Sequence, residues 1–99
     1  MRVVFESDDL RRLYSDADVH LKRLGPDVTR AFRKKVTLLK SVGSEQELRQ
    51  FRSLHLEKLR GDRAGQHSIR LNDQWRLILR LEPGACGRFV IVVDVVDYH

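Results

Sequence analysis

The sequence contains a single cysteine, Cys86, and only two prolines and one tryptophan among its 99 residues. One cysteine cannot form an internal disulfide, and domains that depend on disulfides belong to oxidising compartments. Cys86 lies in a polar turn, Pro83-Gly84-Ala85-Cys86-Gly87, and we expect it to be incidental to function. The low cysteine content therefore favours a protein of the reducing cytoplasm.

Long hydrophobic runs are also absent from the sequence. The longest apolar run, residues 89–93, is followed directly by Asp94, so no segment approaches the length of a transmembrane span. The first residues, Met-Arg-Val-Val-Phe-Glu, lack the apolar region of a secretory signal peptide. We therefore expect no contact with a membrane and a cytoplasmic location.

What the sequence does contain is an excess of positive charge. Its 19 Lys and Arg residues against 14 Asp and Glu give a net charge of +5. This excess favours encounter with polyanions such as nucleic acid or an acidic protein, although a soluble basic surface with no dedicated partner has the same composition. The length suits one domain over residues 1–99, with little room for a second module.

The first half of the chain predicts a short strand and two helices. Residues 2–6 are typical of a strand, and Ser7 is a suitable cap for a first helix with one apolar side. Pro26 and Asp27 suit the start of a second helix, which Gly43 is placed to end. The apolar sides of the two helices are Leu10, Leu13, Tyr14 and Ala17, and Val28, Phe32, Val36, Leu39 and Val42.

The opposite side of the second helix is basic. A nucleic-acid surface is one interpretation, but amphipathic surface helices need a polar side in any case, so we favour a solvated face. The basic residues are Arg30, Arg33, Lys34, Lys35 and Lys40.

The second half of the chain predicts strands. Ser44 and Glu47 have capping-box spacing for a short helical turn to about Gln50, after which residues 54–59 alternate as a strand. A hairpin with a three-residue loop at 72–74 and a final strand at 89–96 follow. This order predicts an α+β domain with two N-terminal helices packed on one face of a mainly antiparallel sheet.

The hairpin register places two arginines opposite each other. With a loop at 72–74, Arg70 pairs with Arg76, and Ile69, Leu71, Trp75, Leu77 and Leu79 share the other face. Facing arginines repel, and a phosphate between them would relieve the repulsion because guanidinium donors match its oxygens. The alternative is that each arginine pairs with a nearby carboxylate such as Glu57 or Asp97.

The chain ends on Asp97, Tyr98 and His99, directly after the apolar final strand. An imidazole titrates near neutral pH, so His99 can donate a proton, while Asp97 or Glu57 can accept one and Tyr98 can stack on a base. A metal site is the competing hypothesis, but the spacing matches no familiar zinc motif, so we expect no metal. The candidate ligands would be His55, Glu57, His67, Asp97 and His99.

Three stretches carry a resemblance to a known family: EKLRGDRAGQ at 57–66, SIRLNDQWR at 68–76 and DYH at 97–99. With them the whole chain resembles HigB-type toxins of the RelE/ParE superfamily. The resemblance implies a RelE/ParE-like fold and a bacterial toxin of a toxin-antitoxin pair. Its activity would be that of an mRNA interferase, an endoribonuclease that enters the ribosomal A site and cuts translated mRNA.

The resemblance also implies a mechanism and partners. A ribose 2′-hydroxyl would attack the adjacent phosphate, with no metal or other cofactor. The neutralising partner would be a HigA-type antitoxin with a helix-turn-helix, and the complex would bind its operator DNA. This chemistry fits two arginines beside an imidazole, since the developing charge on phosphorus needs positive donors and the leaving 5′-oxygen needs a proton.

Site residues follow from the resemblance by position. Arg76 matches a phosphate-contacting arginine of RelE-like nucleases, and Arg70 stands where RelE has a catalytic lysine. His99 falls where RelE has the arginine that assists the leaving group, and Asp97, Tyr98 and His99 match the C-terminal catalytic triplet of HigB. RNA-binding residues are expected nearby at Lys58, Arg60, Arg63 and Ser68.

Two positions depart from the family pattern. Ser68 stands where RelE has a second basic residue, and serine is a poor base. Glu57 lies where some HigB toxins have a catalytic histidine, while His55, two residues earlier, can face the same side of the strand. The general base is therefore open between Glu57 and His55.

Two other functions remain open from the sequence. The first is a toxin like ParE, which blocks DNA gyrase, although ParE-like chains generally lack the terminal Asp-Tyr-His. The second is a non-enzymatic binding module that acts only with its partner in operator repression.

Overall fold

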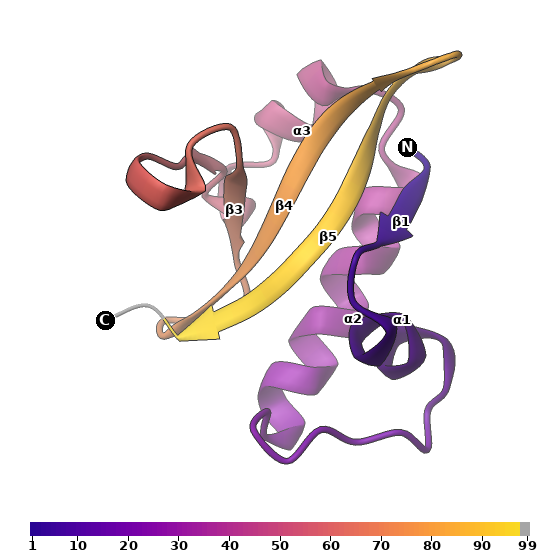
Figure 1. The fold of residues 1–99 in the computed structure, drawn as a ribbon, viewed down its shortest axis with the longest axis vertical. Helices are drawn as coiled ribbons and strands as arrows, with labels where there is room; N and C mark the ends of the chain where they lie inside the picture. The colour runs from indigo at the N-terminus through magenta and orange to yellow at the C-terminus, as the bar shows by residue number, and fades with distance from the viewer. Residues whose placement is uncertain (98–99) are drawn as a thin grey trace.

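A five-stranded sheet forms the centre of the computed structural model, which describes residues 1–97 (Figure 1). The strand order is β1-β5-β4-β3-β2. β1 runs parallel to β5, whereas the other neighbours are antiparallel, so the sheet is mainly antiparallel as predicted. The strands are β1 (Val3–Phe5), β2 (Glu57–Lys58), β3 (His67–Arg70), β4 (Trp75–Gly84) and β5 (Gly87–Asp97).

Three α-helices begin where the sequence predicts. Ser7 caps α1 (Asp8–Ser15) by accepting a hydrogen bond from the Leu10 amide, and Ser44 caps α3 (Glu45–Gln50) in the same way. Proline opens α2 (Pro26–Ser41), where its missing N–H group needs no partner. Within residues 1–97, no helix is long and apolar enough to cross a membrane.

α1 and α2 pack with the sheet around one hydrophobic cluster. Figure 1 shows the two helices together beside β1 and β5. The cluster contains Leu10 and Leu13 of α1 and, from α2, the fully buried Phe32. The sheet contributes Ile69, Leu77, Leu79, Leu81, Val90, Val92 and Val95. The α+β class is therefore confirmed.

The β3–β4 hairpin has the predicted register. Ile69 pairs with Leu77 and Arg70 pairs with Arg76. Because successive side chains of a strand point to opposite faces, burying the first pair under α1 and α2 places both arginines on the other face. We call that other side of the sheet the second face.

The hairpin loop is closed by Asn72. Its side-chain oxygen accepts hydrogen bonds from the amides of Gln74 at 2.9 Å and Trp75 at 2.8 Å. The Leu71 amide donates to the Trp75 carbonyl at 2.9 Å, so residues 72–74 form the loop as predicted. An asparagine that bonds the backbone two residues ahead is typical of such turns.

The predicted strand over residues 54–59 is confirmed only at Glu57 and Lys58, which form β2, and is wrong for residues 54–56. Residues Arg52–Leu54 form a 3-10 turn, η1, and His55 follows in the left-handed conformation with φ 47° and ψ 53°. Only Glu57 and Lys58 pair with β3. The apolar residues at 54 and 56 fit the alternation of a strand, but Leu54 belongs to the 3-10 turn and is buried there.

The ends of the first two helices also differ from expectation. α1 stops at Ser15, so Ala17 lies beyond it. α2 stops at Ser41, and Val42 leaves it in an extended conformation. Gly43 does not have the positive φ of a helix-ending glycine; its amide donates to the Glu47 carboxylate at 3.0 Å and so joins the α3 cap.

The second face is covered in part by the segment after β2. Ile78 and Leu59 are buried but do not belong to the main hydrophobic cluster. Arg63, in the 3-10 turn η2 (Gly61–Arg63), lies 3.9 Å from Asp94, which pairs with Ile78 across β4 and β5. The turn therefore reaches over this part of the second face, and the hairpin end is left open.

We expect the Phe32→Ala variant to lower the free energy of unfolding by about 3–5 kcal/mol, because a fully buried phenyl ring leaves a cavity. Urea denaturation measures this loss. Phe51→Ala is the matched control, since that ring is 36% exposed and its removal should cost well under half as much. Equal losses for both variants would contradict the position of the core.

Candidate functional site

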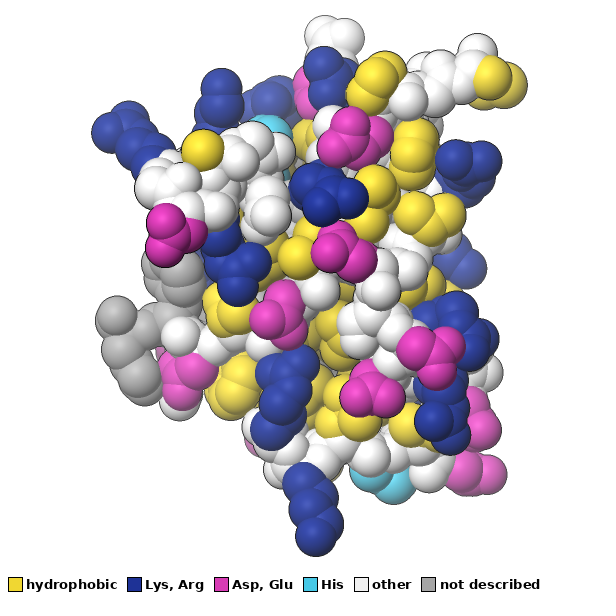
Figure 2. Space-filling view, in the orientation of Figure 1, with side chains coloured by type: hydrophobic (Ala, Val, Ile, Leu, Met, Phe, Trp, Pro, Cys, Tyr) yellow, Lys and Arg dark blue, Asp and Glu magenta, His cyan; other side chains and the backbone are white. Residues whose placement is uncertain are grey.

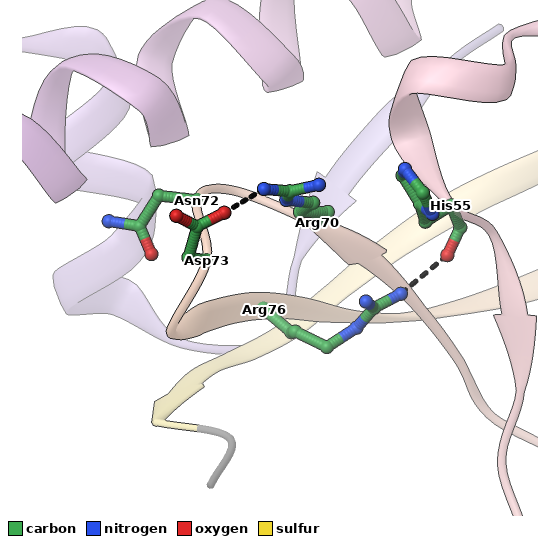
Figure 3. Close-up of a pocket in the computed structure, with 5 residues that line it drawn as sticks. All are labelled: His55, Arg70, Asn72, Asp73 and Arg76. Carbon is green, nitrogen blue, oxygen red and sulfur yellow. Dashed lines mark hydrogen bonds and ion pairs between the residues drawn. The ribbon is translucent and has the colours of Figure 1, made fainter.

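A shallow pocket of about 310 Å³ lies at the hairpin end of the second face. Figure 3 shows His55, Arg70 and Arg76 arranged around it, with the hairpin loop on one side. Its volume is near the lower end of ligand pockets, about 300 Å³. We call this site the arginine pocket; its lining residues are His55, Arg70, Asn72, Asp73 and Arg76.

Arg70 forms an ion pair inside the pocket. Its Nη2 donates to Oδ1 of Asp73, three residues ahead in the hairpin loop. The Arg70 side chain is 39% exposed and that of Asp73 is 92% exposed. Exposed ion pairs contribute little net free energy, about 0–1 kcal/mol, so an incoming anion can displace this carboxylate.

Arg76 is held by neutral oxygen atoms. Its Nε donates to the Ser68 hydroxyl at 2.8 Å, and its Nη2 donates to the backbone carbonyl of His55 and, at 3.4 Å, to that of Ser68. Neutral acceptors orient a guanidinium group without cancelling its charge. A loop carboxylate thus meets Arg70, and these three oxygens help to orient Arg76.

The two candidate bases occupy different places. His55 is exposed and lines the arginine pocket. It is not part of a strand, and its backbone has the left-handed conformation. Glu57 is exposed on β2 and pairs with Ser68, so its side chain belongs to the second face but does not line the pocket. Between the two, His55 is nearer to the paired arginines.

The C-terminal triplet is described only at its first residue. Asp97 pairs with Trp75, and its Oδ2 accepts a hydrogen bond from Nε2 of Gln74 at 2.9 Å. The end of β5 therefore lies beside the hairpin that carries the arginine pocket, since Val96 pairs with Arg76. Tyr98 and His99 lie outside the described residues.

The four residues predicted to bind RNA have different surroundings. Lys58 and Arg60 are exposed. Arg63 donates to Oε1 of Gln66 at 3.2 Å and lies near Asp94. Ser68 is fully buried, and its hydroxyl accepts the Arg76 hydrogen bond, so a direct contact of this side chain with RNA does not fit the structure.

Elsewhere on the second face, positive and negative side chains alternate. Figure 2 shows dark-blue and magenta side chains interspersed over β4 and β5, with hydrophobic side chains between them. Arg80 lies 3.1 Å from Glu6 and 3.4 Å from Glu82. Arg23 lies 3.1 Å from Asp94, which Arg63 also approaches. Carboxylates thus offset these arginines.

His67 lies away from the arginine pocket. It pairs with Leu79, so it belongs to the face of the sheet that the helices cover. Burial lowers the pKa of His67 first, and the positive charge of Arg49 lowers it further, while Glu45 acts in the opposite direction. Among residues 1–97, no three His, Cys, Asp or Glu side chains lie together as metal ligands would.

The sequence profile of the family described as "RelE-like toxin of type II toxin-antitoxin system HigB" matches residues 3–99. The chain belongs to this HigB family. Among solved structures, the YoeB/ParE toxin from Agrobacterium tumefaciens matches over 100% of both chains with a TM-score of 0.58 and 19% identity. A likeness at this identity shows a shared fold. No match was found among curated proteins.

Membership of the HigB family makes this protein a toxin of a type II toxin-antitoxin system, with an antitoxin as its partner. The arginine pocket contains three of the residues that the family resemblance singles out, His55, Arg70 and Arg76. Sequence reasoning missed the role of Ser68 as a partner of Arg76. The predicted register could have indicated this contact, because it places Ser68 diagonally across the hairpin from Arg76. Residues in this relation lie within reach of a long side chain.

Sequence reasoning also missed Asp73 and Asn72. Asp73 stands three residues after Arg70 in the loop, close enough for an ion pair once the hairpin closes. Asn72 is a loop residue whose side chain bonds the backbone. Both contacts can be predicted only if the side chains of the loop are considered as partners of the strand residues, and the loop is not treated merely as a connection between two strands.

We expect the Asp73→Asn variant to bind RNA more tightly by about two- to fivefold, because it removes a carboxylate that competes with phosphate for Arg70. Fluorescence anisotropy with a labelled oligonucleotide measures the affinity. Asp9→Asn on α1 is the matched control, since it changes the net charge equally but leaves the pocket lining intact. An equal gain for both variants would assign the effect to net charge alone.

His67 predicts a pH dependence of stability. Its pKa is lowered in the folded state from 6.5, so below pH 6.5 the unfolded chain binds a proton that the folded chain resists. Stability is therefore full above that pH and falls as the pH drops toward the lowered value. Urea denaturation of His67→Gln should show a shallower fall between pH 7 and 5. The exposed His20→Gln serves as the control, and an unchanged slope in His67→Gln would refute this expectation.

Proposed function

We propose that this toxin is a ribosome-dependent endoribonuclease that cuts translated mRNA in the arginine pocket without a metal ion. The observation that supports this most is the pairing of Arg70 and Arg76 in one open pocket beside an exposed imidazole. Two guanidinium groups at a cross-strand pair suit a phosphodiester, which carries a negative charge and accepts their hydrogen bonds.

The proposed reaction is attack of a ribose 2′-hydroxyl on the adjacent phosphate. The bond from phosphorus to the 5′-oxygen breaks, and a 2′,3′-cyclic phosphate and a 5′-hydroxyl form. Arg76 and Arg70 would stabilise the negative charge that develops on the phosphate oxygens. Phosphate would replace Asp73 on Arg70, because that ion pair is exposed.

Proton transfers complete the proposed reaction. We propose His55 as the base that accepts the 2′-hydroxyl proton, since its side chain lines the pocket, and Glu57 as the alternative on the same face. His99 would donate a proton to the leaving 5′-oxygen. Asp97 would position or accept protons, and Tyr98 would stack on a base. These roles of the C-terminal triplet rest on the resemblance to HigB toxins.

The proposed partners follow from the same resemblance. Translated mRNA in the ribosomal A site would be the substrate, and the exposed Lys58 and Arg60 would contact its backbone beside the pocket. A HigA-type antitoxin with a helix-turn-helix would neutralise the toxin, and their complex would bind operator DNA. The site of action would be the bacterial cytoplasm.

We expect Arg76→Ala and His99→Ala to lower the rate of mRNA cleavage by about 10²–10³-fold each, the cost of removing one group that stabilises the transition state. Primer extension on mRNA in a reconstituted translation reaction measures the rate. Arg30→Ala, on the exposed side of α2, is the matched control and should cleave like the unmodified toxin.

Three results would contradict the proposal. Full cleavage by both variants would show that the pocket and the triplet are not the catalytic groups. Loss of DNA supercoiling by gyrase, with intact mRNA, would instead indicate a toxin that acts like ParE. Absence of growth arrest when the protein is produced without its antitoxin would indicate a partner-binding module.

A further inference from the structure

The Ser68 side chain is a buried polar group at the centre of the hairpin. Its residue is 0% exposed, between Glu57 on β2 and Ile78 on β4 in the sheet register. A buried hydroxyl is costly unless it forms hydrogen bonds. The Ser68 oxygen accepts the Nε–H group of Arg76 at 2.8 Å, a hydrogen bond with a charged donor.

Ser68 acts on Arg76 through two atoms. Besides the hydroxyl, its backbone carbonyl accepts from Nη2 at 3.4 Å. Ser68 pairs with Ile78, which lies two residues after Arg76 on β4. The register of the hairpin therefore determines both contacts between Ser68 and Arg76. The guanidinium group is thereby held beside β3, where Arg76 lines the arginine pocket.

A third contact ties Arg76 to the segment before β2. Its Nη2 also donates to the backbone carbonyl of His55, a residue 21 positions away in the sequence. His55 has the left-handed backbone conformation, and its side chain lines the same pocket (Figure 3). One residue therefore holds the arginine through its backbone and presents an imidazole beside it.

We propose that Ser68 is a positioning residue: its buried hydroxyl fixes the Arg76 guanidinium for the phosphate and does not touch the RNA. This inference rests on the proposed ribonuclease function of the pocket. A free arginine side chain loses rotamer entropy on binding the reacting group, and an arginine fixed in advance loses less. A group fixed in advance also costs no reorganisation during the reaction.

The choice of serine fits this role in three ways. A carboxylate at this position would orient Arg76 equally well but would cancel its charge. A lysine would place a second positive charge beside Nε, and alanine would remove the acceptor of the partly buried Nε–H group. A hydroxyl supplies the acceptor and adds no negative charge beside the guanidinium group.

The test compares Ser68→Ala with Ser68→Thr, which keeps the hydroxyl, in single-turnover cleavage of mRNA on programmed ribosomes. The alanine variant should cleave about 10- to 100-fold more slowly at saturating substrate, the value of a hydrogen bond to a charged group. The substrate concentration at half-maximal rate should stay nearly unchanged. The threonine variant should restore most of the rate.

A double-mutant cycle separates positioning from other effects. In the Arg76→Ala background, Ser68→Ala should cause no further loss, because the hydroxyl acts only through the arginine. Thr29→Val is the matched control, since it removes another buried hydroxyl, on α2, and should leave the rate unchanged. Additive losses in the double variant would overturn the proposal.

A readout without catalysis keeps the inference distinct from the proposed function. In ¹H–¹⁵N spectra, the Arg76 Nε–H signal should exchange slowly with water in the original protein and in Ser68→Thr, and quickly in Ser68→Ala. Unchanged exchange in Ser68→Ala would overturn the positioning role whatever the activity. Absence of cleavage by the original protein would overturn the ribonuclease function, and the exchange rates would still decide whether Ser68 holds Arg76.

Discussion

The register of the β3–β4 hairpin is the constraint on which the site depends. The loop closed by Asn72 sets which residues of the two strands face each other. Since strand side chains alternate between faces, the same register that buries Ile69 and Leu77 places Arg70 opposite Arg76. Hydrophobic burial thus enforces a repulsive pair of charges, because a slip of one residue would expose the core.

The structure relieves this repulsion differently for each arginine. Arg70 meets the exposed carboxylate of Asp73 in the hairpin loop, which phosphate can replace. Arg76 donates hydrogen bonds to oxygens of Ser68 and His55, which orient its guanidinium group and carry no negative charge themselves. One arginine is thus suited to exchange its anion and the other to stay in place, a division of roles that suits binding followed by chemistry.

Local patterns predicted most of the fold, and long-range contacts account for what was missed. Ser7, Pro26 and Ser44 mark the helix starts through contacts within one turn, and the hairpin follows from alternation around its loop. The backbone of His55 could not be predicted in this way. Its left-handed conformation goes with a contact to Arg76, 21 residues away, and nothing in residues 54–59 distinguishes it from a strand.

The carboxylates of the second face are unevenly distributed, and this distribution bears on where the proposed RNA substrate would bind. Along β4 and β5, Glu6, Glu82 and Asp94 lie against arginines and offset their charge. At the hairpin, the carboxylate that lines the pocket is Asp73, on an exposed loop. Opposite charges that lie close together produce little electrostatic field at a distance. The net charge of +5 therefore attracts anions most strongly where the ion pairs between arginines and carboxylates are weakest. In the proposed function, this distribution favours the hairpin end as the place where an RNA backbone binds, although arginines are spread over the whole face.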